Sequence, residues 1–181
     1  MEHRKNAFQY HIEQILALPY LDLELIKSKK FKVVVDCINS TGAISLPPLL
    51  DALNCEFILI NDELTGDFNH NPEPVPQNLT ELSTEVLKNN ADLGIAVDPD
   101  VDRLVLVCED GSMFSEEYTI VAIAEFILKH KKGNTVSNLS STRALADITK
   151  DAGQEYFASA VGEVNVVTKM KAVNAVFGGE G

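Results

Sequence analysis

The sequence predicts an α/β protein made of two consecutive units with similar element order. The run from residue 32 to residue 37 centres on three successive β-branched valines, which is typical of a strand buried on both faces of a sheet that carries helices on either side. Short β-rich runs of this kind alternate along the chain with segments whose apolar residues recur at helical spacing. The length of 181 residues accommodates one domain or two small ones.

The composition indicates a folded, soluble chain. Hydrophobic residues make up 45% and charged residues 23%, and the net charge of −12 makes nucleic acid and anionic membranes unfavourable partners. No apolar run is long enough to span a membrane, and the charged start of the sequence lacks the apolar core of a signal peptide. Cys37, Cys55 and Cys108 are widely spaced in apolar surroundings, which favours buried free thiols. We therefore expect a cytoplasmic protein.

Residues 1–112 form the first predicted unit. Apolar residues at helical spacing predict a helix from Phe8 to Leu16, which Pro19 ends, and a short helical turn near Leu23. Strands are expected at 32–37, 57–60, 93–97 and 104–108, and helices at 45–53 and 78–90. Ser45 is the expected cap of the former helix, and Asn78 with Glu81 forms a pattern typical of a capping box for the latter.

Prolines at positions 72, 74 and 76 predict an extended course for the polar stretch 61–77, because they disfavour both helix and central strand. His70 lies in this stretch, and we expect it to make a structural hydrogen bond rather than to bind a ligand. The polar turn 39–42 follows the first strand and is likewise interpreted as structural.

Residues 113–181 form the second predicted unit. Helices are expected at 116–129, 142–152 and 164–173, and strands at 135–139, 155–160 and 175–177. Three loops at strand ends can face a substrate. Ser140, Ser141 and Arg143 offer hydroxyl groups and a cation to an anion, the turn 160–163 follows a strand, and Gly178, Gly179 and Glu180 place a carboxylate after an accessible backbone.

The loop between the strands at 93–97 and 104–108 carries the strongest chemical signal. Asp98, Asp100 and Asp102 alternate along it, and side chains at alternate positions of a curled loop can converge on one point. Converging carboxylates repel one another, and a divalent cation removes that repulsion. With no His or Cys beside them, these oxygen ligands favour Mg²⁺, with Mn²⁺ or Ca²⁺ as alternatives. Arg103 suits a phosphate oxygen beside the metal.

The same loop allows other interpretations. An EF-hand is rejected, because Arg103 stands where the sharp turn needs glycine and the flanking segments are predicted strands. A haloacid-dehalogenase-type phosphatase, with Asp98 as the phosphorylated nucleophile and Asp100 beside it, stays open as the alternative enzyme. A non-enzymatic metal-binding module, or a plain acidic surface loop, also stays open.

Residues 98–103, Asp-Pro-Asp-Val-Asp-Arg, resemble the metal loop Asp-Gly-Asp-Gly-Asp-Arg of the phosphohexomutases, the phosphoglucomutase and phosphomannomutase superfamily. The stretches 33–42 and 178–181 agree with that family in order and spacing, and 67–74 resembles its Phe-x-Asn-His-x-Pro-x-Pro loop. The resemblance runs from about residue 6 to the end of the chain. It implies two consecutive three-layer α/β/α domains with mixed sheets, the second and third of the family, with the third truncated.

The resemblance also implies that the sequence is a fragment of a larger enzyme. It contains no counterpart of the family's Thr-Ala-Ser-His-Asn-Pro phosphoserine loop, which belongs to a first domain, and no phosphate-binding fourth domain. We therefore expect the fragment itself to be inactive and the first and fourth domains to be its partners. The family often carries Lys where Ser140 stands, and Glu163 occupies a variable position of the loop 160–163.

For the parent enzyme, the resemblance implies a Mg²⁺-dependent intramolecular phosphotransferase that interconverts hexose 1-phosphate and 6-phosphate through a phosphoserine. Asp98, Asp100 and Asp102 would hold the metal and Arg103 would steady the phosphoryl group. Glu180 would accept hydrogen bonds from sugar hydroxyls, with Gly179 and Arg143 also in the substrate site. Hexose 1,6-bisphosphate is the expected intermediate and activator. Glucose, mannose and amino-sugar phosphates all stay open as substrates.

Overall fold

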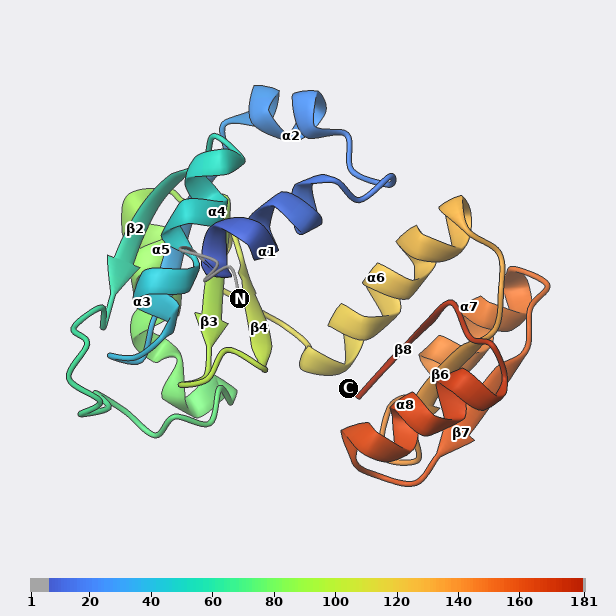
Figure 1. Ribbon diagram of the computed structural model, residues 1–181. Coiled ribbons are helices and arrows are strands. Elements are labelled where there is room, and N and C mark those ends of the chain that lie inside the picture. Colours follow the sequence, from blue (N-terminus) through green and yellow to red (C-terminus); the bar gives the residue numbers. More distant parts are fainter. Residues whose placement is uncertain (1–6, 181) are drawn as a thin grey trace, which may run out of the picture. The chain divides into compact units, whose positions relative to one another are not determined.

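A computed structural model describes residues 7–180, and these form two compact units that divide between Phe114 and Ser115 (Figure 1). The ends of the predicted domain ranges, at residues 1–6 and 181, lie outside the described residues. Both units are α/β, so the predicted fold class is confirmed. Each unit is described separately below.

The first unit is built on a mixed sheet with strand order β2-β1-β3-β4-β5. β1 pairs in parallel with β2 and β3, whereas β4 runs antiparallel to β3 and β5 runs antiparallel to β4. The short loop between β3 and β4 requires that antiparallel pairing, while helices connect the parallel strands. The strands are β1 (Lys32–Asp36), β2 (Glu56–Ile60), β3 (Leu93–Val97), β4 (Leu104–Cys108) and β5 (Met113–Phe114).

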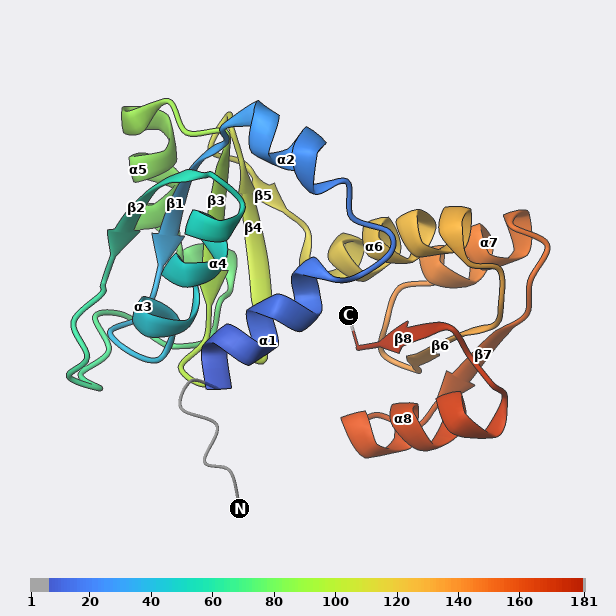
Figure 2. The ribbon, with the colours of Figure 1, turned by 45° about the horizontal axis from the view of Figure 1, so that its top comes forward.

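Helices cover both faces of this sheet (Figure 2). Val34 of β1 packs in one cluster with Leu82 and Val86 of α5, whereas Val33 and Val35 pack on the opposite face with Leu50 of α4. This alternation explains why β1 needs a continuous apolar run, because it is buried on both sides. The helices are α1 (Ala7–Leu16), α2 (Leu23–Lys29), α3 (Gly42–Ser45), α4 (Pro47–Ala52), the 3₁₀ turn η1 (Pro76–Asn78) and α5 (Thr80–Asn89).

The parallel strands β1 and β3 end at the same edge of the sheet, where Asp36 is paired with Ala96. The turn that follows β1 therefore lies beside the loop that follows β3. A hydrogen bond joins the two, because the Ser40 hydroxyl donates to the carbonyl of Pro99 over 3.0 Å. The carboxyl edge of a parallel sheet is where α/β proteins build ligand sites.

The second unit has a three-stranded sheet with order β7-β6-β8. All three strands are parallel, since β6 pairs in parallel with both neighbours. This differs from the predicted mixed sheet, because a helix connects each consecutive pair of these strands and returns the chain to the same end. The elements are α6 (Glu116–His130), β6 (Thr135–Asn138), α7 (Ala144–Asp151), β7 (Tyr156–Ser159), α8 (Glu163–Ala172) and β8 (Phe177–Gly179).

The helices α6 and α7 cover one face of the second sheet and α8 covers the other (Figure 2). Ile120 and Ala124 of α6 form a buried cluster with Leu145 of α7. The central strand β6 is completely buried although three of its four residues are polar. Its polar groups are paired, for example the Thr135 hydroxyl with that of Thr149 over 2.7 Å, as the cost of burying an unpaired polar group requires.

Both predicted helix caps are wrong. Ser45 is the last residue of α3, and its hydroxyl donates to the carbonyl of Thr41 instead of capping α4. The Asn78 amide donates to the carbonyl of Glu73, and Glu81 accepts from Asn61, so no capping box forms at α5. In both cases a nearby chain segment offers a partner that competes with the helix N-terminus.

Two strands also differ from the prediction. The two-residue strand β5 was not predicted, and it extends the first sheet beyond the expected boundary near residue 113. β8 begins two residues later than expected and includes both glycines. A Cβ atom at Gly178 would lie 2.8 Å from the carbonyl oxygen of Val136, so the close approach of β6 explains the glycine.

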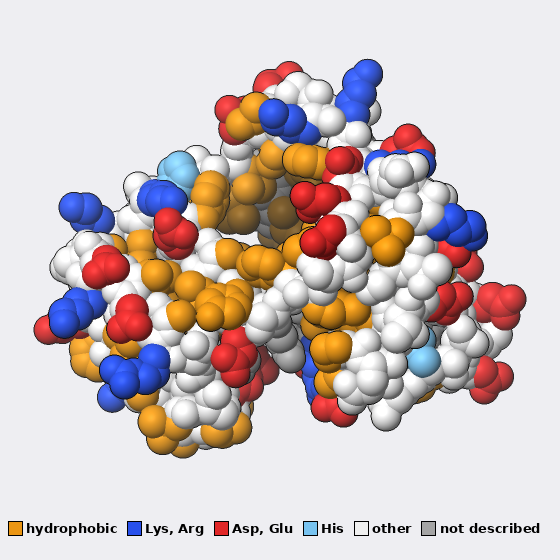
Figure 3. Space-filling view, turned by 180° about the vertical axis from the view of Figure 1, so that it is seen from behind, with side chains coloured by type: hydrophobic (Ala, Val, Ile, Leu, Met, Phe, Trp, Pro, Cys, Tyr) orange, Lys and Arg blue, Asp and Glu red, His pale blue; other side chains and the backbone are white. Residues whose placement is uncertain are grey.

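Acidic and basic side chains are interspersed on the face shown in Figure 3. No helix in the described part of the chain is long and apolar enough to cross a membrane. The cysteines are free, as predicted, and Cys37 is buried whereas Cys55 and Cys108 are half-buried. Burial and the nearby charges of Asp36 and Asp62 raise the pKa of Cys37 to about 12, so this thiol is unreactive at neutral pH.

Candidate metal centre and sugar site

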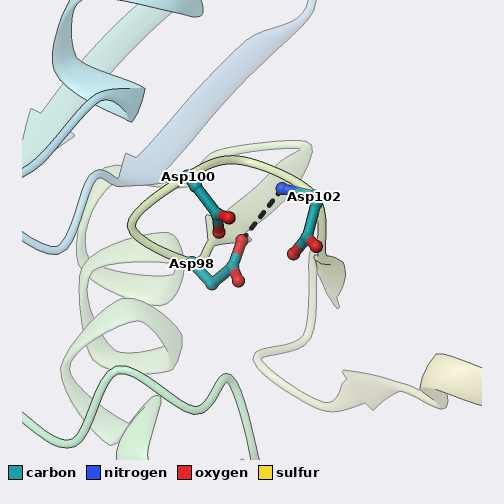
Figure 4. A group of neighbouring side chains, drawn as sticks. All are labelled: Asp98, Asp100 and Asp102. Atoms are coloured by element: carbon teal, nitrogen blue, oxygen red, sulfur yellow. Dashed lines mark hydrogen bonds between the residues drawn. The ribbon is translucent and has the colours of Figure 1, made fainter.

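The loop between β3 and β4 brings its three aspartates together, as their alternation predicts. Asp98 directly follows β3, and the loop curls back so that one oxygen from each carboxylate lies within 4.8 Å of the others. The carboxyl groups of Asp98, Asp100 and Asp102 point toward one another in Figure 4. Asp98 is buried, whereas Asp100 and Asp102 are exposed, so the cluster opens to solvent on one side.

Asp98 accepts hydrogen bonds from the backbone of its own loop. Its Oδ1 accepts hydrogen bonds from the backbone N–H groups of Asp102 and Arg103, each over 3.0 Å. Burial would raise the pKa of Asp98, but these N–H groups and the side chains of Asp102 and Asp100 outweigh it and hold the pKa below its usual range. Asp98 is therefore an anion at neutral pH with one oxygen already engaged.

The pKa of Asp102 is shifted in the opposite direction. A side-chain hydrogen bond with Asp98, together with the negative charge of Asp98, raises the pKa of Asp102 above its usual range. As the pH falls, Asp102 therefore takes up a proton before Asp98 does. Mutual repulsion of this kind is what a hard cation removes, and a set of carboxylate oxygens with no nitrogen or sulfur donor among them suits Mg²⁺, Mn²⁺ or Ca²⁺. The residues present fit such an ion.

Val101 holds the loop in a conformation that L-residues rarely adopt. Its φ of 62° lies in the left-handed region, where a β-branched side chain is sterically disfavoured. The tight turn needs this conformation, because the N–H of Val101 donates back to the carbonyl of Asp98 over 3.1 Å. The curl that gathers the carboxylates is therefore strained at this position.

Substitution of Val101 by glycine is expected to stabilise the first unit by about 1 kcal/mol, because glycine relieves about 1–2 kcal/mol of strain and loses part of that gain to its larger unfolded-state entropy. Thermal or urea unfolding measures the change. Asn90 is the matched control, because it is exposed, has a φ of 48° and belongs to a residue type that tolerates this region. A V101G variant no more stable than N90G would contradict the assignment of strain.

A cavity of about 340 Å³ adjoins the cluster. Asp98, Pro99 and Arg103 line it on one side, and residues 71–73 line it on the other. The Arg103 side chain is 52% exposed, and its Nε lies 3.7 Å from Oδ2 of Asp98. Most of the guanidinium donors therefore stay available to an anion at the cavity.

The far wall of this cavity is fixed by a buried polar network that was predicted only in part. His70 makes the expected structural hydrogen bonds, with Nε2 at 2.8 Å from Oδ2 of Asp36 and Nδ1 at 2.8 Å from the carbonyl of Asn71. Asp36 is buried at the end of β1 and also accepts from the amide of Asn61 over 3.1 Å. The network ties the 61–77 loop to the sheet edge that carries the loop 98–103. The acidic end of an otherwise apolar strand was the available signal for Asp36.

In the second unit, Glu180 lies at the carboxyl edge of the sheet, directly after β8. Its Oε1 accepts from the Asn138 amide and from the Gly162 N–H, each over 2.7 Å. Gly179 belongs to β8 and pairs with Ser137, which places Glu180 beside the end of β6. Asn138 was not predicted, although a polar residue ending a buried strand was a usable signal.

The loop 140–143 is arranged differently from the anion site expected there. The hydroxyl and N–H groups of Ser140 and Ser141 all donate to Oδ1 of Asn138, so they are engaged within the protein. Arg143 is exposed and lines a separate surface cavity of about 460 Å³ with Lys150 and Tyr156. A substrate role for Arg143 stays a prediction.

The sequence matches two family domains over nearly its whole length. Residues 9–111 match the domain described as "Phosphoglucomutase/phosphomannomutase, alpha/beta/alpha domain II". Residues 115–181 match the one described as "Phosphoglucomutase/phosphomannomutase, alpha/beta/alpha domain III".

Named relatives agree with these matches. The chain is 33% identical over 178 residues to a probable phosphoglucosamine mutase of Methanopyrus kandleri, covering 97% of this chain and 38% of the relative. It is 31% identical over 176 residues to a phosphomannomutase/phosphoglucomutase of Pseudomonas aeruginosa, covering 93% of this chain and again 38% of the relative. The chain thus spans little more than a third of the length of these relatives.

Solved structures extend the likeness to the fold. A phosphoglucomutase/phosphomannomutase family protein from Burkholderia thailandensis aligns with a TM-score of 0.84 and 28% identity over 97% of this chain and 38% of that one. A putative phosphomannomutase from Thermus thermophilus aligns with the same TM-score at 23% identity, over 96% of this chain and 40% of that one.

Proposed function

The chain belongs to the phosphoglucomutase/phosphomannomutase family, and from this premise we propose that it is the metal-binding and sugar-binding middle of a phosphohexomutase. The intact enzyme would interconvert hexose 1-phosphate and hexose 6-phosphate through a phosphoserine supplied by a domain outside this chain. The observation that carries the proposal is the convergence of three carboxylates beside an available arginine at the carboxyl edge of the first sheet.

Asp98, Asp100 and Asp102 are the proposed ligands of a Mg²⁺ ion. When bound, the ion supplies Lewis-acid stabilisation to the oxygens of a phosphoryl group. The backbone N–H groups on Oδ1 of Asp98 fix the orientation of that carboxylate within the loop. The exposure of Asp100 and Asp102 leaves the site open to a phosphoserine that approaches from outside the unit.

Arg103 is the proposed phosphoryl-binding residue. Its guanidinium is permanently charged and forked, which suits two oxygens of a phosphoryl group. The weak contact with Asp98, at 3.7 Å, keeps the group at the cavity without occupying its donors. In this position Arg103 would bind the phosphoryl group and balance its negative charge.

Glu180 is the proposed sugar-binding residue, and the second unit supports this role by fixing the carboxylate at the sheet edge. A carboxylate accepts hydrogen bonds from sugar hydroxyls and does not bind a phosphate group, so it can hold the sugar ring in either orientation. The relatives named above include glucosamine, glucose and mannose phosphate mutases, so the substrate is proposed only as a hexose phosphate.

The comparisons lend no support to the haloacid-dehalogenase-type alternative. In addition, one oxygen of Asp98 is engaged by two backbone N–H groups and the side chain is buried, which suits a positioned ligand.

Removal of divalent metal tests the proposal. In the full-length enzyme that contains this chain, we expect EDTA to abolish the conversion of hexose 1-phosphate to hexose 6-phosphate and excess Mg²⁺ to restore it. A coupled assay that detects the 6-phosphate measures both steps for glucose, mannose and glucosamine phosphates in turn. Turnover that survives complete metal removal, or the absence of turnover on all three substrates with Mg²⁺ present, would contradict the proposed function.

A further inference from the structure

Asn138 is the hydrogen-bonding centre of the second unit's carboxyl edge. The residue ends β6 and is 3% exposed. Oδ1 accepts from the N–H and hydroxyl groups of Ser140 and Ser141, at distances between 2.7 and 3.2 Å. Nδ2 donates to Oε1 of Glu180 over 2.7 Å.

These partners leave only one orientation for the amide. The atom facing four donors must be the oxygen, and the atom facing the Glu180 carboxylate must be the nitrogen, because a carboxylate only accepts. A flipped amide would set an NH₂ group against N–H and hydroxyl donors and its oxygen against an anion. Asn138 therefore acts as a fixed donor toward Glu180.

The two carboxylate oxygens of Glu180 differ in their hydrogen-bond partners. Oε1 accepts from both Asn138 and the Gly162 N–H, and these bonds tie it to the end of β6 and to the residue that precedes α8. Among residues 7–180, no hydrogen bond or ion pair reaches Oε2. The carboxylate is thus held by one oxygen and presents the other.

We propose that Asn138 is the positioning residue for Glu180 and that it directs Oε2 of that carboxylate toward the hydroxyl groups of a hexose phosphate. The inference rests on the proposed function for the identity of the ligand, whereas the contact between Asn138 and Glu180 stands on the geometry alone. The site would then distinguish hydroxyl groups of the substrate by whether they can donate a hydrogen bond to Oε2 of Glu180.

Asn138→Asp separates the two roles of the side chain. Aspartate keeps an acceptor for Ser140 and Ser141 but replaces the donor toward Glu180 with a second negative charge. In the full-length enzyme, we expect KM for the hexose phosphate to rise roughly 10- to 100-fold, as for loss of a hydrogen bond to a charged group, with little change in kcat. In an E180Q background the same substitution should add little, because its effect passes through Glu180.

Asn134→Asp is the matched control. Asn134 precedes the other end of β6, is half-buried, and donates its amide to the carbonyl of Val173. This variant undergoes the same chemical change in the same unit, and its KM should stay at the wild-type value. A wild-type KM in a folded N138D enzyme, or an equal rise of KM in N134D, would overturn the inference.

A second measurement needs neither turnover nor the N138D variant. In the 181-residue chain, we expect E180Q to shift the NMR resonances of the Asn138 side-chain amide and the Gly162 N–H, while E125Q, which changes an exposed glutamate of α6, leaves both unchanged. Unshifted resonances in E180Q would overturn the positioning role. Shifted resonances together with a wild-type enzyme that turns over no hexose phosphate would instead reject the proposed function and leave the positioning contact established.

Discussion

Replacement of Asp100 by asparagine is expected to lower mutase turnover in the full-length enzyme by roughly 10³-fold or more, because a bound metal contributes several kcal/mol to charge stabilisation. The substitution keeps the shape of the side chain and removes one negative charge from the proposed metal site. Asp100 is exposed, and the backbone N–H groups of the loop bind Asp98 instead. We therefore expect the fold to persist while activity and Mg²⁺ affinity fall together.

Initial rates of the purified enzyme measure the expected loss of turnover, and its thermal unfolding measures whether the fold persists. Asp51→Asn is the matched control, because Asp51 is an exposed aspartate in α4 with no part in the cluster. It should retain wild-type turnover. Near-normal turnover in D100N would contradict the metal site, and loss of the folded state in D100N would contradict the view that Asp100 has no structural role.

Gly94→Val is expected to destabilise the first unit by several kcal/mol, above the roughly 1–3 kcal/mol typical of overpacked cores. Gly94 lies in β3 with α5 directly over it. A Cβ atom there would lie 2.8 Å from Cβ of Val107 and 2.8 Å from Cγ2 of Val86. Valine must therefore force α5 and β3 apart. Asp98 directly follows β3.

Urea unfolding of the 181-residue chain, followed by circular dichroism, measures this effect. Gly94→Ala should cost less than valine. Val86→Ala removes one of the two clashing groups, so the G94A/V86A double variant should be more stable than the sum of the two single changes predicts. Additive losses would show that the close approach of α5 is not the cause, and a G94V variant with wild-type stability would contradict the packing altogether.

Much of the fold could be predicted from the sequence because its signals are local. The β-branched run at β1 predicts a strand buried on both faces, and Val34 and Val35 indeed pack in clusters on opposite sides of it. The alternation of Asp98, Asp100 and Asp102 predicts convergence, and the loop between β3 and β4 provides it. Periods of two residues and of one helical turn depend only on neighbours along the chain.

The failures involve partners that are distant in the sequence or that compete for the same group. Ser45 has the residue type and position of a cap, but α3 already contains it and the carbonyl of Thr41 takes its hydroxyl. The Ser40 hydroxyl reaches Pro99, 59 residues away, and this contact could not be deduced from spacing. β5 is too short to show any periodicity, and its pairing with β4 defines it.

The candidate sites likewise include one feature that is local in the sequence and one that depends on a distant contact. The three aspartates of the proposed metal site alternate within one short loop, so the sequence alone predicts that they converge. Asn138 and Glu180 lie 42 residues apart and meet only because β6 and β8 are neighbours in the sheet. The family motif carries glycine where Val101 stands, and only the φ of 62° shows that this valine strains the loop.

Transfer of labelled phosphate from glucose 1,6-bisphosphate tests the central claim most directly. With Mg²⁺ present, the full-length enzyme should acquire label that resists hydroxylamine, as a phosphoserine does, and the 181-residue chain should acquire none. Hydroxylamine-labile label on the 181-residue chain itself would contradict this account, because it would identify an aspartyl phosphate and make Asp98 a nucleophile instead of a metal ligand.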